Sequence, residues 1–212
     1  MKTSIALKSL LGAGALTLPL MAFAESNVQT GAATAAPGAT AHVDFSIVIP
    51  KILYLRVGSG SAYASGTLAS ANTIDLITFS PAAGTVGNGT PVAGTGGDLT
   101  GGVETAAIVS NSGNVTLNAT AGGALGDGNG DTIPFTQITT AATTLTSGTQ
   151  LPAPVLTNGT SSNVVLTAPA TKLIVQDAKW TYSYANAANV PAGTYGGVNT
   201  NNSRVTYTAT MP

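Results

Sequence analysis

The residue types best suited to hold a metal ion lie in one short run, in which Asp127, Asn129 and Asp131 alternate with glycines. This spacing matches the first ligands of a calcium-binding loop, where glycine lets the backbone curl and the side-chain oxygens converge. Thr132 follows where such a loop needs glycine, and Ile138 stands where it needs a closing glutamate. We therefore favour a structural turn rich in Asn, Asp and Gly, with a calcium site as the alternative.

The sequence contains few residues that could form the catalytic site of a hydrolase. His42 is the only histidine, so a Ser-His-Asp triad or a histidine-ligated metal would have to form around it. The sequence contains no G-x-S-x-G motif that could supply a nucleophile. We interpret His42 as an exposed residue of a strand, and we predict that the protein is not an enzyme and needs no cofactor, calcium excepted in the alternative above.

Carboxylates could supply the acid and base of a glycosidase, which needs two of them on either side of a glycosidic bond. The candidates are Asp44, Asp75, Glu104 and Asp177. Each stands singly within an alternating apolar pattern, so we interpret them as solubilising charges at strand edges.

Aromatic side chains at Trp180, Tyr182 and Tyr184 share one face of a strand, because successive side chains point to opposite sides. Flat rings on one face could stack on sugars, or they could form the core side of the strand. The intervening residues Lys179, Thr181 and Ser183 are polar, as expected of the opposite, solvated face. We favour the core interpretation.

The elements that would position these residues begin after a signal peptide, which we assign to residues 1–24. Lys2 and Lys8 form a positive start, an apolar run covers residues 10–21, and Ala22 and Ala24 form a small-x-small cleavage site. We therefore predict export, to the cell surface or the extracellular medium, with the periplasm as the alternative. No later run approaches the roughly 20 apolar residues that a membrane-spanning helix needs.

The amino-acid composition limits the classes of partner that the chain could bind. Charged residues are 7% of the chain and the formal net charge is −1, so there is no basic face for nucleic acid. Cysteine is absent, so a hydrophobic core rather than disulfides must hold the exported fold.

The most apolar stretch runs from His42 to Gly58 and alternates with a period of two on both sides of Pro50. Charged residues at Asp44, Lys51 and Arg56 argue against a membrane anchor. We predict that the stretch forms the central strand pair of the core, kinked at Pro50, where the strand ladder loses a donor.

Further short apolar runs bounded by turn residues predict strands, and no segment has the helical period over ten or more residues. The predicted strands cover residues 73–79, 103–109, 114–119, 133–138, 164–166, 173–184 and 204–211. Residues 111–114 predict a hairpin turn, and residues 78–102 and 139–160 predict long loops. The pattern indicates a single all-β domain, an antiparallel β-sandwich over residues 41–212, preceded by a flexible leader or edge strand over residues 25–40.

Three sequences near the C-terminus carry a resemblance: WTYSY from Trp180, VPAGTYGG from Val190 and RVTYTATMP from Arg204. Together they resemble the end of bacterial immunoglobulin-like pilin subunits of the spore coat U or archaic chaperone-usher type. The resemblance implies an immunoglobulin-like sandwich and a role in fimbriae, cell adhesion or biofilm.

These observations predict a structural subunit of the cell surface that joins copies of itself into filaments by β-strand addition. We expect the inserting strand to be the leader, with Val28, Ala32 and Ala33 lying over the neighbour's sheet edge. The alternative is a secreted or periplasmic module that binds polysaccharide or calcium.

Overall fold

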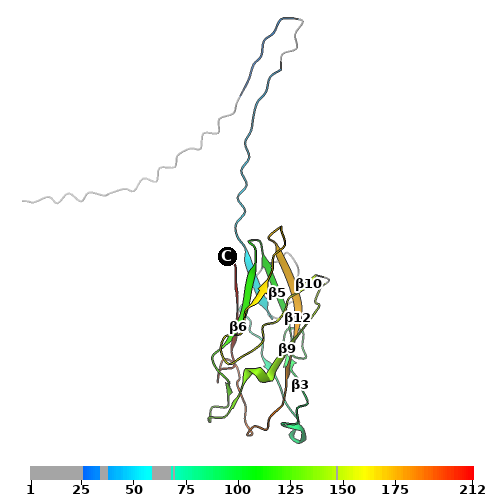
Figure 1. Ribbon diagram of the computed structural model, residues 1–212, viewed down its shortest axis with the longest axis vertical. Helices are drawn as coiled ribbons and strands as arrows, with labels where there is room; N and C mark the ends of the chain where they lie inside the picture. The colour runs from blue at the N-terminus through cyan, green and yellow to red at the C-terminus, as the bar shows by residue number, and fades with distance from the viewer. Residues whose placement is uncertain (1–25, 34–37, 59–67, 69, 147) are drawn as a thin grey trace, which may run out of the picture. The chain divides into compact units, whose positions relative to one another are not determined.

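The computed structural model describes residues 26–33, 38–58, 68, 70–146 and 148–212 (Figure 1). The chain divides into two units, Met1–Ile49 and Pro50–Pro212. Regular structure in the described part of the chain is β-strand, apart from two short 3₁₀ turns at Ala83–Thr85 and Phe135–Gln137. None of the helical turns described is long or apolar enough to cross a membrane. The all-β class is therefore as the sequence predicts.

The larger sheet of the second unit is built on two long neighbouring strands, β5 (Val103–Ser110) and β12 (Ile174–Tyr184). β1 (Leu53–Val57) pairs antiparallel with β5 and ends the sheet on that side. Three shorter strands pair with β12: β3 (Val92–Ala93), β9 (Ile138–Thr143) and β10 (Thr149–Gln150). Only β10 of these runs parallel to it.

The smaller sheet has three antiparallel strands in the order β11 (Val164–Leu166), β6 (Val115–Ala121) and β13 (Val205–Thr210). Two further strand pairs are short: β2 (Ile77–Thr78) with β4 (Thr95–Gly96), and β7 (Leu125–Gly126) with β8 (Thr132–Ile133). Side chains of the two larger sheets meet in one hydrophobic core.

Alternation along the strands explains this core. Ala106 and Ile108 of β5, Trp180 of β12, and Leu117 and Ala119 of β6 are all buried in it. The indole Nε1 of Trp180 donates a hydrogen bond to the carbonyl oxygen of Leu151 over 3.0 Å, so its one polar atom is satisfied inside the core. The core interpretation of the aromatic run is confirmed, because Trp180, Tyr182 and Tyr184 are all buried.

Most predicted strands are present with nearly the predicted bounds, and the predicted turn between β5 and β6 contains Gly113 at φ 102°. The predicted strand over residues 133–138 is wrong, because the 3₁₀ turn Phe135–Gln137 interrupts it, and the strand predicted over residues 73–79 is present only at Ile77–Thr78. The prediction of a long loop over residues 139–160 is wrong in part, because β9 pairs with β12 over six residues. Similarly, β3 and β4 lie within the predicted loop of residues 78–102. Thr and Ala dominate these strands, and their weak apolar signal hid them.

The prediction for His42 to Gly58 is wrong for its first half. After Pro50 the chain forms β1, as predicted, but residues 42–49 form no strand and their side chains are exposed. Alternation of apolar and polar residues shows that a segment has one face suited to burial. It does not show which surface covers that face.

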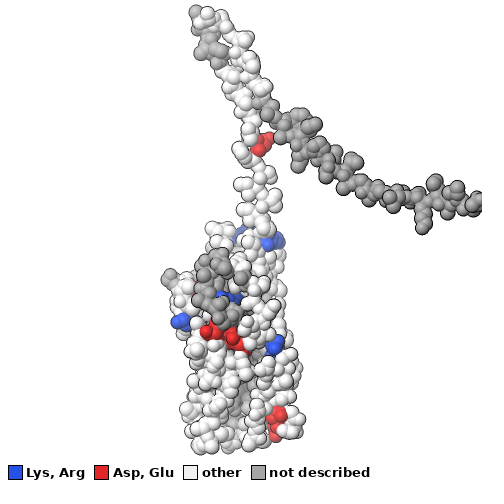
Figure 2. Space-filling view, turned by 180° about the vertical axis from the view of Figure 1, so that it is seen from behind, with Lys and Arg blue, Asp and Glu red and all other residues white. Residues whose placement is uncertain are grey.

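Charged side chains are sparse on the molecular surface. Figure 2 shows scattered charges on a face otherwise made of uncharged side chains, in keeping with the low charged content of the sequence. Such a surface gives little electrostatic repulsion between copies.

Candidate functional site

The most unusual surface feature is an exposed apolar run, which we call the apolar segment and define as residues 42–49. Its large side chains are 74–89% exposed, and they belong to Val43, Phe45, Ile47, Val48 and Ile49. In an extended strand, residues 43, 45, 47 and 49 would share one face. A contiguous exposed apolar surface of this kind marks an interaction site.

A second feature is a line along which the core is incompletely covered, between the edge strands β1 and β13. Each of these strands has a strand neighbour on one side only among the described residues, and the two strands contact each other. Their core-facing side chains are only half-buried, whereas those of the neighbouring β6 are buried. We call this line the seam and define it by Leu53, Leu55, Val57, Val205, Tyr207, Ala209 and Met211.

Polar contacts fix the chain at one end of the seam. Lys51 Nζ donates a hydrogen bond to the carbonyl oxygen of Pro212 over 2.9 Å, and Figure 1 shows the C-terminus beside the start of β1. The amide of Asn111 donates to the carbonyl oxygen of Pro50 and its Oδ1 accepts the N–H of Ile52, each over 2.8 Å. The point where the chain enters β1 is therefore held in place.

Acidic side chains gather at the other end of β1. Arg56 Nη2 lies 3.5 Å from Asp98 Oδ2, with the two side chains 9% and 2% exposed. Asp98 Oδ1 accepts the N–H of Thr105 over 2.7 Å, and Glu104 Oε2 accepts the N–H of Asp98 over 3.2 Å. Gly58, at φ +68°, lies so close that an added Cβ would be 2.5 Å from carboxylate oxygens of both Glu104 and Asp75.

Burial raises the pKa of Glu104 to about 8, and the nearby carboxylates of Asp75 and Asp98 add to this effect. The backbone N–H of Asp98 acts in the opposite direction, because it stabilises the ionised form. Glu104 is therefore largely protonated at neutral pH.

The interpretation of the carboxylates as solubilising charges is wrong for Glu104 and Asp177, which are each 5% exposed. Asp177 accepts hydrogen bonds from the N–H and the hydroxyl of Thr146, over 3.1 and 2.8 Å. It pairs in register with Ala107, so it points to the opposite face of the sheet from Glu104. Those two carboxylates do not converge. Asp44 is exposed, as predicted.

The predicted calcium residues form the tip of the β7–β8 hairpin. Asp127 Oδ1 accepts the N–H groups of Asn129 and Asp131 over 2.8 and 3.1 Å, and its Oδ2 accepts the side-chain amide of Asn129 over 3.2 Å. These donors, the N–H of Asn129 first, lower the pKa of Asp127. In the part of the chain that is described, no group of three or more acidic, histidine or cysteine side chains is arranged to hold a metal ion.

The residues expected to insert into a neighbour, Val28, Ala32 and Ala33, are exposed and belong to no strand. His42 is also exposed. The expected cleavage site after Ala24 lies outside the described residues.

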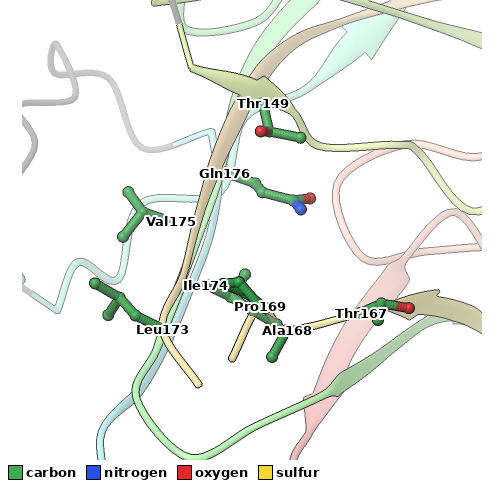
Figure 3. Close-up of a pocket in the computed structure, with 8 residues that line it drawn as sticks. All are labelled: Thr149, Thr167, Ala168, Pro169, Leu173, Ile174, Val175 and Gln176. Carbon is green, nitrogen blue, oxygen red and sulfur yellow. The ribbon is translucent and has the colours of Figure 1, made fainter. Parts of the chain in front are cut away.

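A surface pocket of about 410 Å³ lies beside the start of β12 (Figure 3). Its lining is uncharged and non-aromatic: Thr149, Thr167, Ala168, Pro169, Leu173, Ile174, Val175 and Gln176. The Oε1 atom of Gln176 is buried and has no hydrogen-bond partner among the described residues. Figure 3 shows Gln176 and Val175 pointing to opposite sides of the strand. A stacking platform for sugars is absent from this lining.

Comparisons of the chain with protein-family models, with characterised proteins and with solved structures gave no match. The functional argument therefore depends on geometry. Sequence reasoning missed the grouping of Arg56, Asp98 and Glu104. One signal was available, because Glu104 occupies an inward position in the alternation set by Ala106 and Ile108.

Proposed function

We propose that this chain is an exported, non-enzymatic structural protein that joins copies of itself by β-strand addition, with the apolar segment as the inserted strand. The observation that carries the proposal is the exposure of Val43, Phe45, Ile47 and Ile49, four large apolar side chains at strand spacing. Water is a poor solvent for this surface, and burial of each such side chain contributes about 1.5–3 kcal/mol.

The seam supports the proposal by offering a matching acceptor. Four half-buried positions on and after β13 alternate along one face: Val205, Tyr207, Ala209 and Met211. At about 3.3 Å per residue, a strand from Val43 to Ile49 spans roughly 20 Å, about the length of β13. The inserted strand would gain backbone hydrogen bonds from a sheet edge and would complete the cover of the core.

The apolar segment replaces the leader as the proposed inserting strand. Val28, Ala32 and Ala33 present one moderately large side chain between them, so most of their affinity would have to come from the backbone. The apolar segment offers both backbone groups and side chains that could fill the seam.

An immunoglobulin-like arrangement of the two sheets, and a place in a fimbrium or adhesive matrix, belong to the same proposal. One detail supports the arrangement. The hydroxyl of Tyr195 donates a hydrogen bond to the carbonyl oxygen of Pro191 over 2.9 Å. A tyrosine whose hydroxyl forms a hydrogen bond to the backbone a few residues upstream is typical of such sandwiches, where it is called a tyrosine corner.

The test is the oligomeric state of the mature protein, beginning at Glu25, measured by light scattering and electron microscopy. We expect the double variant Phe45→Ser/Ile47→Ser to be monomeric and to melt as the native chain does when it is diluted to the monomer, because both side chains are exposed within the chain and association itself raises the melting temperature. Losing two such contacts should weaken association at least a hundredfold. The matched control is His42→Ser, on the opposite face of the segment, which should associate as the native chain does.

Association that survives Phe45→Ser/Ile47→Ser and is lost on deletion of residues 25–40 would show that the leader inserts instead. A native chain that stays monomeric at high concentration and is retained on polysaccharide would contradict the proposal and favour a binding module.

A further inference from the structure

Residues 50–52, which join the apolar segment to β1, are held by Asn111. The side-chain amide of Asn111 donates a hydrogen bond to the carbonyl oxygen of Pro50, and its Oδ1 accepts the N–H of Ile52, each over 2.8 Å. The backbone N–H of Asn111 also donates to the carbonyl oxygen of Ile52, over 3.3 Å. We call these three hydrogen bonds the Asn111 clamp.

The Asn111 clamp keeps residues 50–52 in line with β1. Leu53 pairs in register with Ser110, so the contact of Ile52 with Asn111 extends the pairing of β1 with β5 by one residue. In an antiparallel pair, the backbone groups of alternate residues point to the same side of the strand. Because the backbone groups of Ile52 point toward Asn111, those of the odd-numbered residues point to the edge of β1 that has no strand neighbour among the described residues.

The apolar segment is complementary to this edge of its own chain. If residues 50–52 formed a hairpin loop, the segment would run antiparallel to β1 and pair with it. Residues directly opposite each other share a face of the sheet, and the partners on β1 pack against the core. The apolar face of the segment would then cover the seam of its own chain. The pairs would be Ile49 with Leu53, Ile47 with Leu55, and Phe45 with Val57.

The backbone at Ile52 opposes such a loop. Three-residue hairpin loops typically contain a residue in the left-handed conformation, which favours glycine, and residue 52 would occupy that position. A β-branched side chain strongly disfavours this conformation, and the φ of Ile52 is negative. Reversal of the chain here would also break the side-chain hydrogen bonds of Asn111. A two-residue loop fails for another reason, because it needs the backbone groups of Ile52 at the free edge and both already bond to Asn111.

We infer that Asn111 and Ile52 determine which seam the apolar segment enters: they keep it from folding back onto its own chain, so that it is available to a second copy. The inference rests on the proposed function, because it concerns the same segment and the same seam. A segment attached through a short linker acts at an effective concentration of about a millimolar. At protein concentrations far below this, a segment free to fold back would fill its own seam first, and copies would not join.

The test uses a release variant of the mature chain, Ile52→Gly/Asn111→Ala, which supplies a glycine for the loop and removes both side-chain bonds of the clamp. We expect it to stay monomeric, by light scattering, at concentrations where the native chain associates. The sharper readout is the effect of Phe45→Ser/Ile47→Ser on the melting temperature of the dilute monomer. In the native background both side chains are exposed, so the effect should be absent. In the release background they cover the seam, so the melting temperature should fall by several degrees. A merely structural role of Asn111 would not create this dependence.

A second variant tests the same point with the clamp intact. A Gly-Ser-Gly-Ser insertion between Ile49 and Pro50 lets the chain reverse before it reaches the clamp. We expect the same loss of association and the same dependence of the monomer's melting temperature on Phe45 and Ile47. The matched control is the same insertion before His42, at the other end of the apolar segment, which should associate as the native chain does.

A folded release variant that associates as the native chain does, and whose monomer melts independently of Phe45 and Ile47, would overturn the inference. If the release variant does not fold, the same result from the insertion between Ile49 and Pro50 would overturn it. Strand addition between copies would still stand if Phe45→Ser/Ile47→Ser abolished association of the native chain.

The proposed function fails in a different way. If the native chain never associates, but the release variant's monomer depends on Phe45 and Ile47, then the segment fills the seam only within one chain. Joining of copies would be refuted, and the control of folding back by Asn111 and Ile52 would hold.

Discussion

Glycine at position 58 is required for two separate reasons. Its backbone has φ +68°, and a Cβ there would collide with oxygens of Asp75 and Glu104. Gly101 has a similar φ of +64° but open space around it. Gly101→Ala should therefore cost only the backbone strain of about 1–2 kcal/mol.

Gly58→Ala should cost clearly more than Gly101→Ala, because the clash with the two carboxyl groups adds to the backbone strain. Denaturant unfolding of the two variants measures the difference. Equal losses of stability would show that the carboxyl groups do not crowd Gly58 as described.

The side chain of Asn186 holds the loop before β3 in place. Its buried side chain accepts the N–H of Gly87 over 2.8 Å and donates to the carbonyl oxygen of Thr85 over 2.7 Å. Its own φ of +52° is one that asparagine tolerates better than most residues. Asn186→Ala should cost about 2–4 kcal/mol in unfolding free energy, because buried backbone groups lose their partners.

The control is Asn118→Ala, which removes a long 3.4 Å contact with Asn163 on the surface and should cost under about 0.5 kcal/mol. A similar small loss for Asn186→Ala would mean that the loop is held by other contacts.

At the scale of elements, the tip of the β7–β8 hairpin is held by hydrogen bonds to the carboxylate of Asp127. Because its carboxylate accepts two backbone N–H groups within the turn, Asp127→Ala should lower the unfolding free energy by about 1 kcal/mol. The melting temperature of the native chain should be the same in millimolar calcium and in EDTA. A rise of several degrees with calcium would show instead that the loop opens to bind the ion.

The sequence predicts the strands with strong period-two patterns, such as β5, β6, β12 and β13, because each carries apolar residues on one face. It misses β9, whose Thr and Ala residues give little contrast between faces. The largest error concerns residues 42–49. Their pattern is that of a buried strand, but their side chains are exposed. A sequence pattern cannot say whether the complementary face lies in the same molecule.

In the candidate site, too, the features with a local sequence signal could be predicted and those that depend on distant residues could not. Local chemistry predicts the turn at Asp127, because its partners are two and four residues away. The group formed by Arg56, Asp75, Asp98 and Glu104 needs the pairing of β1 with β5 and the loops around it, which no local pattern contains.

At the scale of the whole molecule, the chain combines an exposed apolar segment with a core left partly uncovered along the seam. In the proposed assembly, a row of copies would satisfy both features, each inserting its segment into the next. Such a head-to-tail contact gives open filaments unless the rotation between copies closes a ring, and we expect filaments rather than two-fold dimers.

The absence of cysteine makes the central claim directly testable by disulfide trapping. Mature chains carrying Ile47→Cys are mixed with chains carrying one cysteine on β13, and crosslinked dimers are measured under mild oxidation. Neighbouring strands place same-face residues about 4.5–5.5 Å apart, within the range a disulfide spans. We expect crosslinks with core-facing Val205→Cys or Ala209→Cys, and few with outward-facing Thr206→Cys or Thr208→Cys. Equal yields on both faces, or none on either, would contradict insertion of the apolar segment into the seam.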